Sequence, residues 1–156
     1  MNNTIYTHNE KETKEFAKKF ASKLSGNETI VLTGDLGSGK TKFIEGFLEN
    51  WGFYDTSSPS FTIINEYKVS DLKTIYHFDV YRLDGIDEFL NIGGDEYFGK
   101  SICLIEWGDK IKELLPNKYI HIDISREYNN DDERKIKIEY IGYWYFFKAM
   151  FRRSKI

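Results

Sequence analysis

A glycine-rich octapeptide with one lysine and one threonine is the segment of this chain best suited to chemistry. Residues 34–41 match G-x-x-x-x-G-K-[ST] at every fixed position. The glycines let consecutive backbone N–H groups turn inward around phosphate oxygens, through backbone angles that a Cβ resists. Lys40 would then reach the β- and γ-phosphates, and the Thr41 hydroxyl would ligate Mg²⁺. The predicted nucleotide-binding residues are Gly34, Asp35, Leu36, Gly37, Ser38, Gly39, Lys40 and Thr41.

The alternative interpretation of this octapeptide is a glycine-rich turn with an incidental lysine. With average composition, the pattern should occur by chance in well under ~1% of chains of this length. The short β-branched run Thr29–Thr33 precedes the loop, and apolar residues at helical spacing follow it, from Phe43 to Trp51. A phosphate-binding loop requires that strand before it and that helix after it. We therefore reject the alternative.

Two acidic residues, Asp79 and Glu106, each come at the end of an apolar segment. Such enzymes need a carboxylate near the metal, usually at the end of a neighbouring strand. We expect Glu106 to hold Mg²⁺ directly or through water, and Asp79 to orient the attacking water or a metal-bound water. The alternative for each is a solvated acid that caps the next turn. Lys40, Asp79 and Glu106 are thus the candidate catalytic residues, and Thr41 and Glu106 are the candidate metal ligands.

Other polar residues support weaker hypotheses. Arg82 could neutralise phosphate charge as an arginine finger does, or form a salt bridge with Asp79 or Asp84; the sequence leaves both open. His77 lies on a predicted strand, which favours a core or supporting role over that of a base. The Asn-Lys-x-Asp motif that selects guanine is missing, which favours adenine.

Bulk properties predict one soluble cytoplasmic domain over residues 1–156. Hydrophobic residues make up 40% and charged residues 30% of the chain, a globular balance. The net charge of −3 is unlike that of a nucleic-acid binder. The N-terminus shows no signal peptide, and a single cysteine, Cys103, fits a reducing compartment. We expect this thiol to be buried and inert, since it lies within an apolar run.

The elements around these residues alternate between strands and helices. A capping-box spacing from Thr7 to Glu10 predicts that a helix begins there. Helices are expected over residues 9–25, 43–51, 87–90, 96–98 and 109–115; strands are expected over residues 29–33, 61–69, 74–78, 101–106, 119–125 and 134–141, with an acidic loop over 127–133. This order predicts an α/β fold, a P-loop NTPase-like three-layer sandwich with a mixed, mainly parallel sheet.

Four motifs together resemble the bacterial TsaE (formerly YjeE) ATPases of tRNA threonylcarbamoyladenosine biosynthesis. They are Gly-Asp-Leu-Gly-Ser-Gly-Lys-Thr at 34–41, Ser-Pro-Ser-Phe-Thr at 58–62, Tyr-His-Phe-Asp-Val-Tyr-Arg-Leu at 76–83 and Ile-Glu-Trp at 105–107. The resemblance covers roughly residues 7–125. It implies a P-loop fold, Mg²⁺-dependent ATP hydrolysis, and work with the partner proteins TsaD and TsaB. Those partners transfer threonylcarbamoyl to the adenosine beside the tRNA anticodon, and the ATPase permits repeated turnover.

The same resemblance implies roles for individual residues. Lys40 and Thr41 correspond to the phosphate and metal residues, Glu106 to the metal-side carboxylate, and Asp79 to an essential acid. Residues 58–62 fall at a switch-like segment beside the γ-phosphate, and Trp107 lies close enough to report on the site. Glu10 and Thr13 correspond to the family's segment near the nucleotide base. The segment 127–133 is longer and more acidic than in the family, which weakens the transfer of a nucleotide contact to Arg134.

Two functional alternatives and one segment stay open. A P-loop small-molecule or nucleotide kinase is the first rival, although residues 81–99 hold only one arginine where kinases carry an Arg-rich lid. A nucleotide-gated binding module with negligible hydrolysis is the second. The aromatic and basic tail, residues 142–156, either packs on the domain or presents a surface for tRNA or the partner proteins, and packing is favoured.

Overall fold

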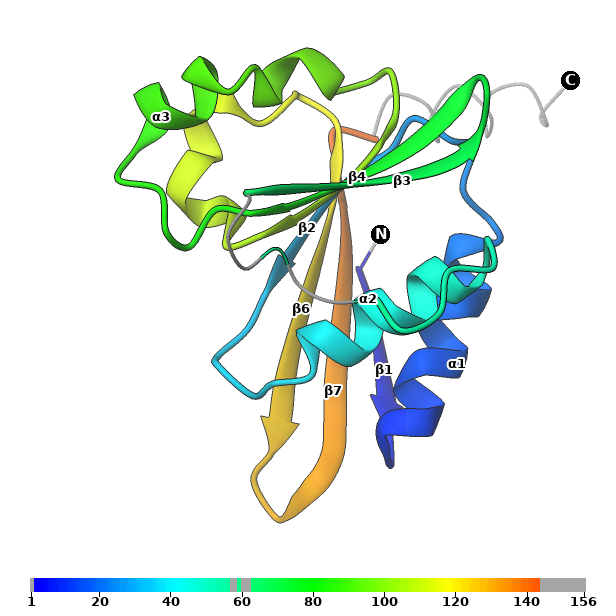
Figure 1. The fold of residues 1–156 in the computed structure, drawn as a ribbon. Coiled ribbons are helices and arrows are strands. Elements are labelled where there is room, and N and C mark those ends of the chain that lie inside the picture. The colour runs from blue at the N-terminus through cyan, green and yellow to red at the C-terminus, as the bar shows by residue number, and fades with distance from the viewer. Residues whose placement is uncertain (1, 57–58, 60–62, 144–156) are drawn as a thin grey trace, which may run out of the picture.

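Seven strands and a few short helices make up the chain in this computed structural model, which describes residues 2–56, 59 and 63–143 (Figure 1). The strands are β1 (Asn2–Thr7), β2 (Thr29–Thr33), β3 (Ile64–Ser70), β4 (Lys73–Asp79), β5 (Ile102–Glu106), β6 (Tyr119–Glu127) and β7 (Asn130–Ile141). The helices are α1 (Glu10–Ala21), α2 (Lys40–Glu49) and α3 (Ile86–Asn91), with 3₁₀ helices η1 (Gly94–Tyr97) and η2 (Gly108–Leu114). Residues 144–156 lie outside the described part.

All seven strands join one mixed sheet in the order β1-β7-β6-β2-β5-β4-β3. The four central strands β6, β2, β5 and β4 are parallel, and β3, β7 and β1 add to the two sides with antiparallel pairing. The central strands β2 and β5 read as nearly continuous apolar runs because helices cover both of their faces. The predicted α/β fold with a mixed sheet is confirmed, and its parallel part is the middle.

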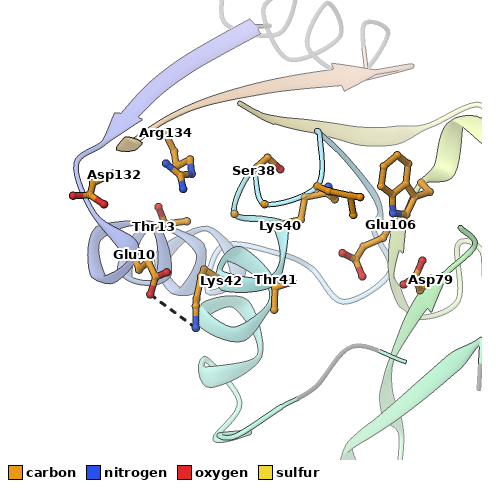
Figure 2. Close-up of a pocket in the computed structure, with 14 residues that line it drawn as sticks. Glu10, Thr13, Ser38, Lys40, Thr41, Lys42, Asp79, Glu106, Asp132 and Arg134 are labelled. Atoms are coloured by element: carbon orange, nitrogen blue, oxygen red, sulfur yellow. Dashed lines mark ion pairs between the residues drawn. The ribbon is translucent and has the colours of Figure 1, made fainter. Parts of the chain in front are cut away.

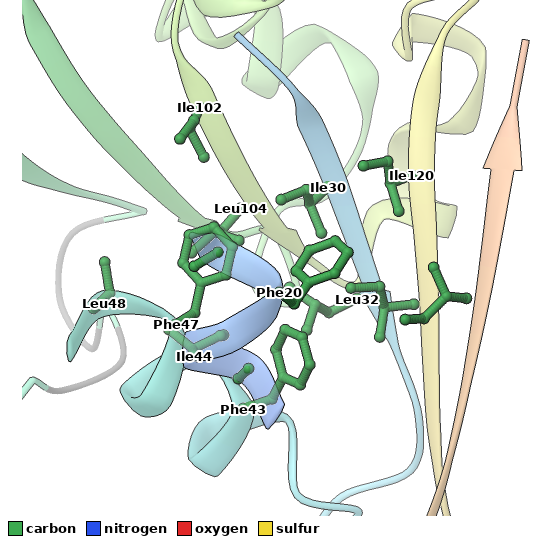
Figure 3. Close-up of a cluster of buried hydrophobic side chains, with 14 of the residues drawn as sticks. Phe20, Ile30, Leu32, Phe43, Ile44, Phe47, Leu48, Ile102, Leu104 and Ile120 are labelled. Atoms are coloured by element: carbon green, nitrogen blue, oxygen red, sulfur yellow. The ribbon is translucent and has the colours of Figure 1, made fainter. Parts of the chain in front are cut away.

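Helices cover the sheet on both sides and create two apolar cores. On one side, Phe20 of α1 and Phe43 and Phe47 of α2 pack against Ile30 and Leu32 of β2 (Figure 3). Helices α1 and α2 touch closely, since a Cβ on Gly46 would lie 2.3 Å from a backbone oxygen of Lys14.

The second core lies on the opposite face of the sheet. There Phe78, Phe89, Ile105 and Ile111 pack together under α3 and η2. Leu104 and Ile105 are neighbours on β5 yet belong to different cores, as the alternation of strand side chains requires. Three layers result. Cys103 is fully buried, and burial raises the pKa of its thiol to about 12, as expected for an inert cysteine.

The start of the chain differs from the prediction. Thr7 ends strand β1 instead of capping a helix, and the cap is Asn9, whose side chain accepts from the Glu12 N–H at 2.9 Å. The Glu12 carboxylate in turn accepts from the backbone N–H of His8 at 2.7 Å. Strand β1 is a polar edge strand without apolar alternation, so its sequence does not indicate a strand. Its backbone pairing with β7 holds it in the extended conformation.

The predicted acidic loop over residues 127–133 is also wrong. Strand β6 continues to Glu127 and β7 begins at Asn130, which leaves only Tyr128 and Asn129 as the turn. The ladder extends beyond the core, and these exposed strand ends carry charge because nothing apolar packs on them.

The remaining boundaries shift by small amounts. The predicted helices over 96–98 and 109–115 are 3₁₀ helices, η1 and η2, and η2 contains a kink at Ile111. The strand predicted from residue 61 begins at Ile64 in the described part, while residues 61 and 62 lie outside it. Among the described residues, no helix combines the length and apolarity needed to cross a membrane.

Candidate functional site

The glycine-rich loop, residues 34–39, links the carboxyl end of β2 to the start of α2. Gly39 is the N-cap residue of α2, with φ +108°, and Gly34 has φ +143°. A Cβ on Gly34 would lie 2.2 Å from the Ile124 carbonyl oxygen, so no other residue fits there without movement. The loop therefore brings backbone N–H groups and a helix N-terminus to one point, an arrangement that binds anions.

A pocket opens between this loop, the end of β5 and the β6–β7 hairpin (Figure 2). Its lining residues are Glu10, Thr13, Leu36, Gly37, Ser38, Gly39, Lys40, Thr41, Lys42, Asp79, Glu106, Trp107, Asp132 and Arg134. All the predicted site residues are brought together here except Gly34 and Asp35. Those two contribute backbone oxygens behind the loop, where they accept hydrogen bonds from Lys40.

Lys40 is a buried cation, only 6% exposed. Its ammonium donates to the carbonyl oxygens of Gly34 and Asp35, the second at 3.1 Å, and lies 4.8 Å from the ring centroid of Trp107. Burial lowers the pKa of Lys40, and the nearby Glu106 carboxylate opposes that shift. No salt bridge of Lys40 exists within the part of the chain that the structure describes. The ammonium is thus available to a bound anion.

The two predicted carboxylates end adjacent parallel strands. The register pairs Asp79 of β4 with Glu106 of β5, so the two side chains reach the same edge of the sheet. Glu106 is buried and lies 2.9 Å from His77 Nε2. Asp79 accepts from the Tyr81 N–H at 3.1 Å; burial raises the pKa of Asp79, and this hydrogen bond opposes the rise. Figure 2 shows both carboxylates across from the start of α2.

The residues present fit a polyphosphate with a divalent cation. The Ser38 hydroxyl is buried without a hydrogen-bond partner among the described residues, and it lies 2.6 Å from where a Cβ on Gly34 would be. Thr41 and Glu106 offer the oxygen ligands that Mg²⁺ prefers. In residues 2–56, 59 and 63–143, no group of three or more His, Cys, Asp or Glu could hold a metal by itself. A Mg²⁺ ion bound here would take phosphate oxygens as further ligands, as Mg²⁺ commonly does.

The sequence analysis missed Lys42 and Asp132 as residues of this pocket, and it gave only weak support to a nucleotide contact of Arg134. The β6–β7 hairpin extends over the loop, and the Arg134 side chain lies against Gly39, 3.4 Å from where a Cβ would be. From the same hairpin, Arg126 donates to the Gly37 carbonyl oxygen at 3.1 Å. Lys42 forms an ion pair with Glu10 at 4.0 Å (Figure 2). Only the sheet topology brings Asp132 and Arg134 of the hairpin over the loop, so no local signal could have found them, whereas Lys42 directly follows Thr41 on α2 and could have been found from its place next to the motif.

Two earlier expectations meet the structure only in part. Burial raises the pKa of Asp79, and the positive charge of Arg82 is among the weaker influences that oppose this rise; the choice between an arginine finger and a salt bridge stays a prediction. The switch-like segment 58–62 lies outside the described residues except for Pro59.

The chain is similar to several known proteins. The family model described as "Threonylcarbamoyl adenosine biosynthesis protein TsaE" matches residues 7–136. The chain belongs to the TsaE family. A TsaE named as a tRNA threonylcarbamoyladenosine biosynthesis protein, from Bacillus subtilis (strain 168), is 44% identical over 138 residues, 87% of this chain and 84% of that relative. The TsaE of Haemophilus influenzae is 40% identical over 142 residues, 86% of this chain and 87% of its own.

A solved structure extends the match to the fold. The crystal structure of YdiB from Bacillus subtilis superposes with a TM-score of 0.73 at 36% sequence identity and covers 99% of this chain and 97% of its own. The fold and the family of this TsaE chain are therefore shown by independent comparisons.

Proposed function

We propose that this chain is a Mg²⁺-dependent ATPase that serves as an accessory subunit in the synthesis of threonylcarbamoyladenosine in tRNA. The observation that carries the proposal is the buried Lys40 ammonium at the start of α2, across a pocket from Asp79 and Glu106. Membership of the TsaE family supports the biosynthetic assignment. The partners would be TsaD and TsaB, with tRNA reached indirectly through them.

Each residue has a role that follows from its place. The loop amides and Lys40 would bind the β- and γ-phosphates and offset their charge. Thr41 and Glu106 would hold the cation, which neutralises charge on the transferred phosphoryl group when bound. Asp79, beside Glu106 at the sheet edge, would orient the attacking water.

The other end of the pocket suits a nucleoside. Glu10 and Thr13 of α1 line it together with Arg134 of β7. A buried hydrogen bond of 2.7 Å between the hydroxyls of Thr7 and Thr13 fixes the start of α1. We propose that this end receives adenine and ribose, since the guanine-selecting motif is missing from the sequence.

Reconstitution tests the proposed function. The chain would be combined with TsaD, TsaB, tRNA, ATP and the threonylcarbamoyl donor, and modified adenosine would be measured over many turnovers. Modification that continues only when this chain is present is the expected result. Equal yields without the chain, or phosphate transferred from ATP to a small acceptor in place of water, would contradict the proposal; the second outcome identifies a kinase.

Asp79→Asn is expected to slow hydrolysis by about 100-fold, the usual scale for loss of a positioned acid or base, and to raise the Tm at pH 7. The folded state raises the pKa of Asp79, so its carboxyl group favours folding below the unfolded pKa. That contribution is lost as pH rises through the folded pKa, and at pH 7 the charged carboxylate destabilises the fold. Asparagine removes the charge and keeps the acceptor for the Tyr81 N–H.

A phosphate-release assay and a thermal melt check the Asp79 prediction. Asp71→Asn is the matched control, because Asp71 is exposed on the β3–β4 turn, where it forms a surface ion pair with Lys68. Wild-type hydrolysis in Asp79→Asn would remove this residue from the mechanism.

Trp107 fluorescence is expected to change when ATP and Mg²⁺ are added. The Lys40 ammonium lies close to the Trp107 ring and would move to phosphate, which alters the field at the indole. A titration of intrinsic emission, with Trp107→Phe as the control, measures this response. A flat titration at saturating ATP would place Trp107 away from the reacting groups.

A further inference from the structure

His77 is a buried histidine that reaches one of the candidate catalytic carboxylates. It lies on β4 two residues before Asp79 and is 1% exposed. Its Nε2 atom is 2.9 Å from Oε2 of Glu106, which is itself 4% exposed. Strand residues two apart share a face of the sheet. His77 and Asp79 therefore both lie on the face of β4 from which Glu106 can be reached.

The partners of the ring define which nitrogen carries the proton. The Glu106 carboxylate can only accept, so Nε2 of His77 donates. The other nitrogen, Nδ1, is buried and has no hydrogen-bond partner among the described residues. A proton there would be a buried donor without an acceptor among those residues. His77 therefore directs its Nε2–H at Glu106.

We propose that His77 is a positioning residue for Glu106, an inference that rests on the proposed ATPase function. Its N–H engages Oε2 of Glu106 and fixes the side-chain rotamer, which leaves Oε1 for the cation in the pocket. Carboxylates that bind metal are commonly held by such a hydrogen bond. A histidine that served the core alone would be a poor choice, because its unpartnered Nδ1 is buried where an apolar side chain would pack without the cost of burying a polar atom.

Two substitutions at this position separate positioning from packing. His77→Leu removes the donor and keeps an apolar body, whereas His77→Gln returns an amide N–H at about the distance of Nε2. His121→Leu is the matched control: His121 also bonds a neighbouring side chain, Thr33 Oγ1, at 2.8 Å, but it lies on β6 and is not among the residues that line the pocket.

In His77→Leu we expect kcat for ATP hydrolysis to fall by about 10- to 100-fold, the range known for residues that hold metal ligands. The KM for ATP should change little, and the Mg²⁺ concentration for half-maximal activity should rise. His77→Gln should recover most of the loss, and His121→Leu should match the wild type. A loss in His77→Leu that glutamine does not restore, or one that only follows the folded fraction, would overturn the proposal.

A second measurement needs no nucleotide and stays informative if His77→Leu fails to fold. Long-range ¹H–¹⁵N spectra of histidine-labelled wild type should show His77 as the Nε2–H tautomer, with a ring proton protected from exchange. That signal should shift in Glu106→Gln. The Nδ1–H tautomer, or a His77 signal that does not change in Glu106→Gln, would overturn the positioning role even if the protein hydrolyses ATP. Absence of hydrolysis in the wild type would instead contradict the proposed function.

Discussion

Lys40→Ala is expected to raise the Kd for ATP by at least about 100-fold, because it removes charge-assisted hydrogen bonds worth about 1.5–3 kcal/mol each. Lys40 is the buried cation at the phosphate end of the pocket. In the described part of the chain it forms no salt bridge that would compete with a bound phosphate. Equilibrium binding of a fluorescent ATP analogue measures the effect. Lys18→Ala, at an exposed lysine of α1, is the control and should bind as the wild type does.

The same substitution should leave the fold intact. Burial lowers the pKa of Lys40, so the charged ammonium costs free energy in the folded state, and alanine relieves that cost while it removes the bonds to Gly34 and Asp35. The two effects oppose each other, and we expect little change in Tm. An unfolded Lys40→Ala variant, or a folded one that binds ATP as tightly as the wild type, would contradict the role given to Lys40.

Glu106→Ala is expected to reduce Mg²⁺-dependent hydrolysis by about 100-fold or more, the scale expected for a group that acts on the reacting centre. ATP binding should persist, because Lys40 and the loop amides remain. Alanine also leaves the His77 N–H without an acceptor in a buried place, at a cost of about 1–3 kcal/mol in stability. Turnover, binding and thermal melts separate these effects.

Glu106→Gln is the matched variant. Glutamine keeps an acceptor for His77 and loses only the charge, so it should melt close to the wild type and still hydrolyse slowly. If Glu106→Gln were fully active, the charge of Glu106 would not hold the cation. If both variants lost ATP binding together with hydrolysis, Glu106 would maintain the shape of the pocket and would not act on the cation.

The parts of the site that could be predicted are those that short segments determine. The glycine-rich loop follows from backbone angles that only glycine adopts freely, as at Gly34 and Gly39. Asp79 and Glu106 could be found because each ends a short apolar strand, and parallel strands bring their carboxyl ends to one edge. The central sheet and the helices on its two faces follow from the same local patterns.

The parts that could not be predicted depend on pairing between distant segments. Strand β1 has no apolar alternation and exists because β7 offers it an edge. Arg134 and Asp132 reach the pocket only because the β6–β7 ladder continues past the core and over the loop. The contact between His77 and Glu106 joins residues 29 positions apart. Its geometry follows from the β4–β5 register, which no motif encodes.

Calorimetric titration of ATP into folded protein with Mg²⁺ tests the central claim most directly, with Lys40→Ala as the comparison. A saturable heat in the wild type that is lost in the variant is the expected result. No heat from either ATP or GTP on folded wild-type protein would contradict the assignment of the loop and the start of α2 as a nucleotide site.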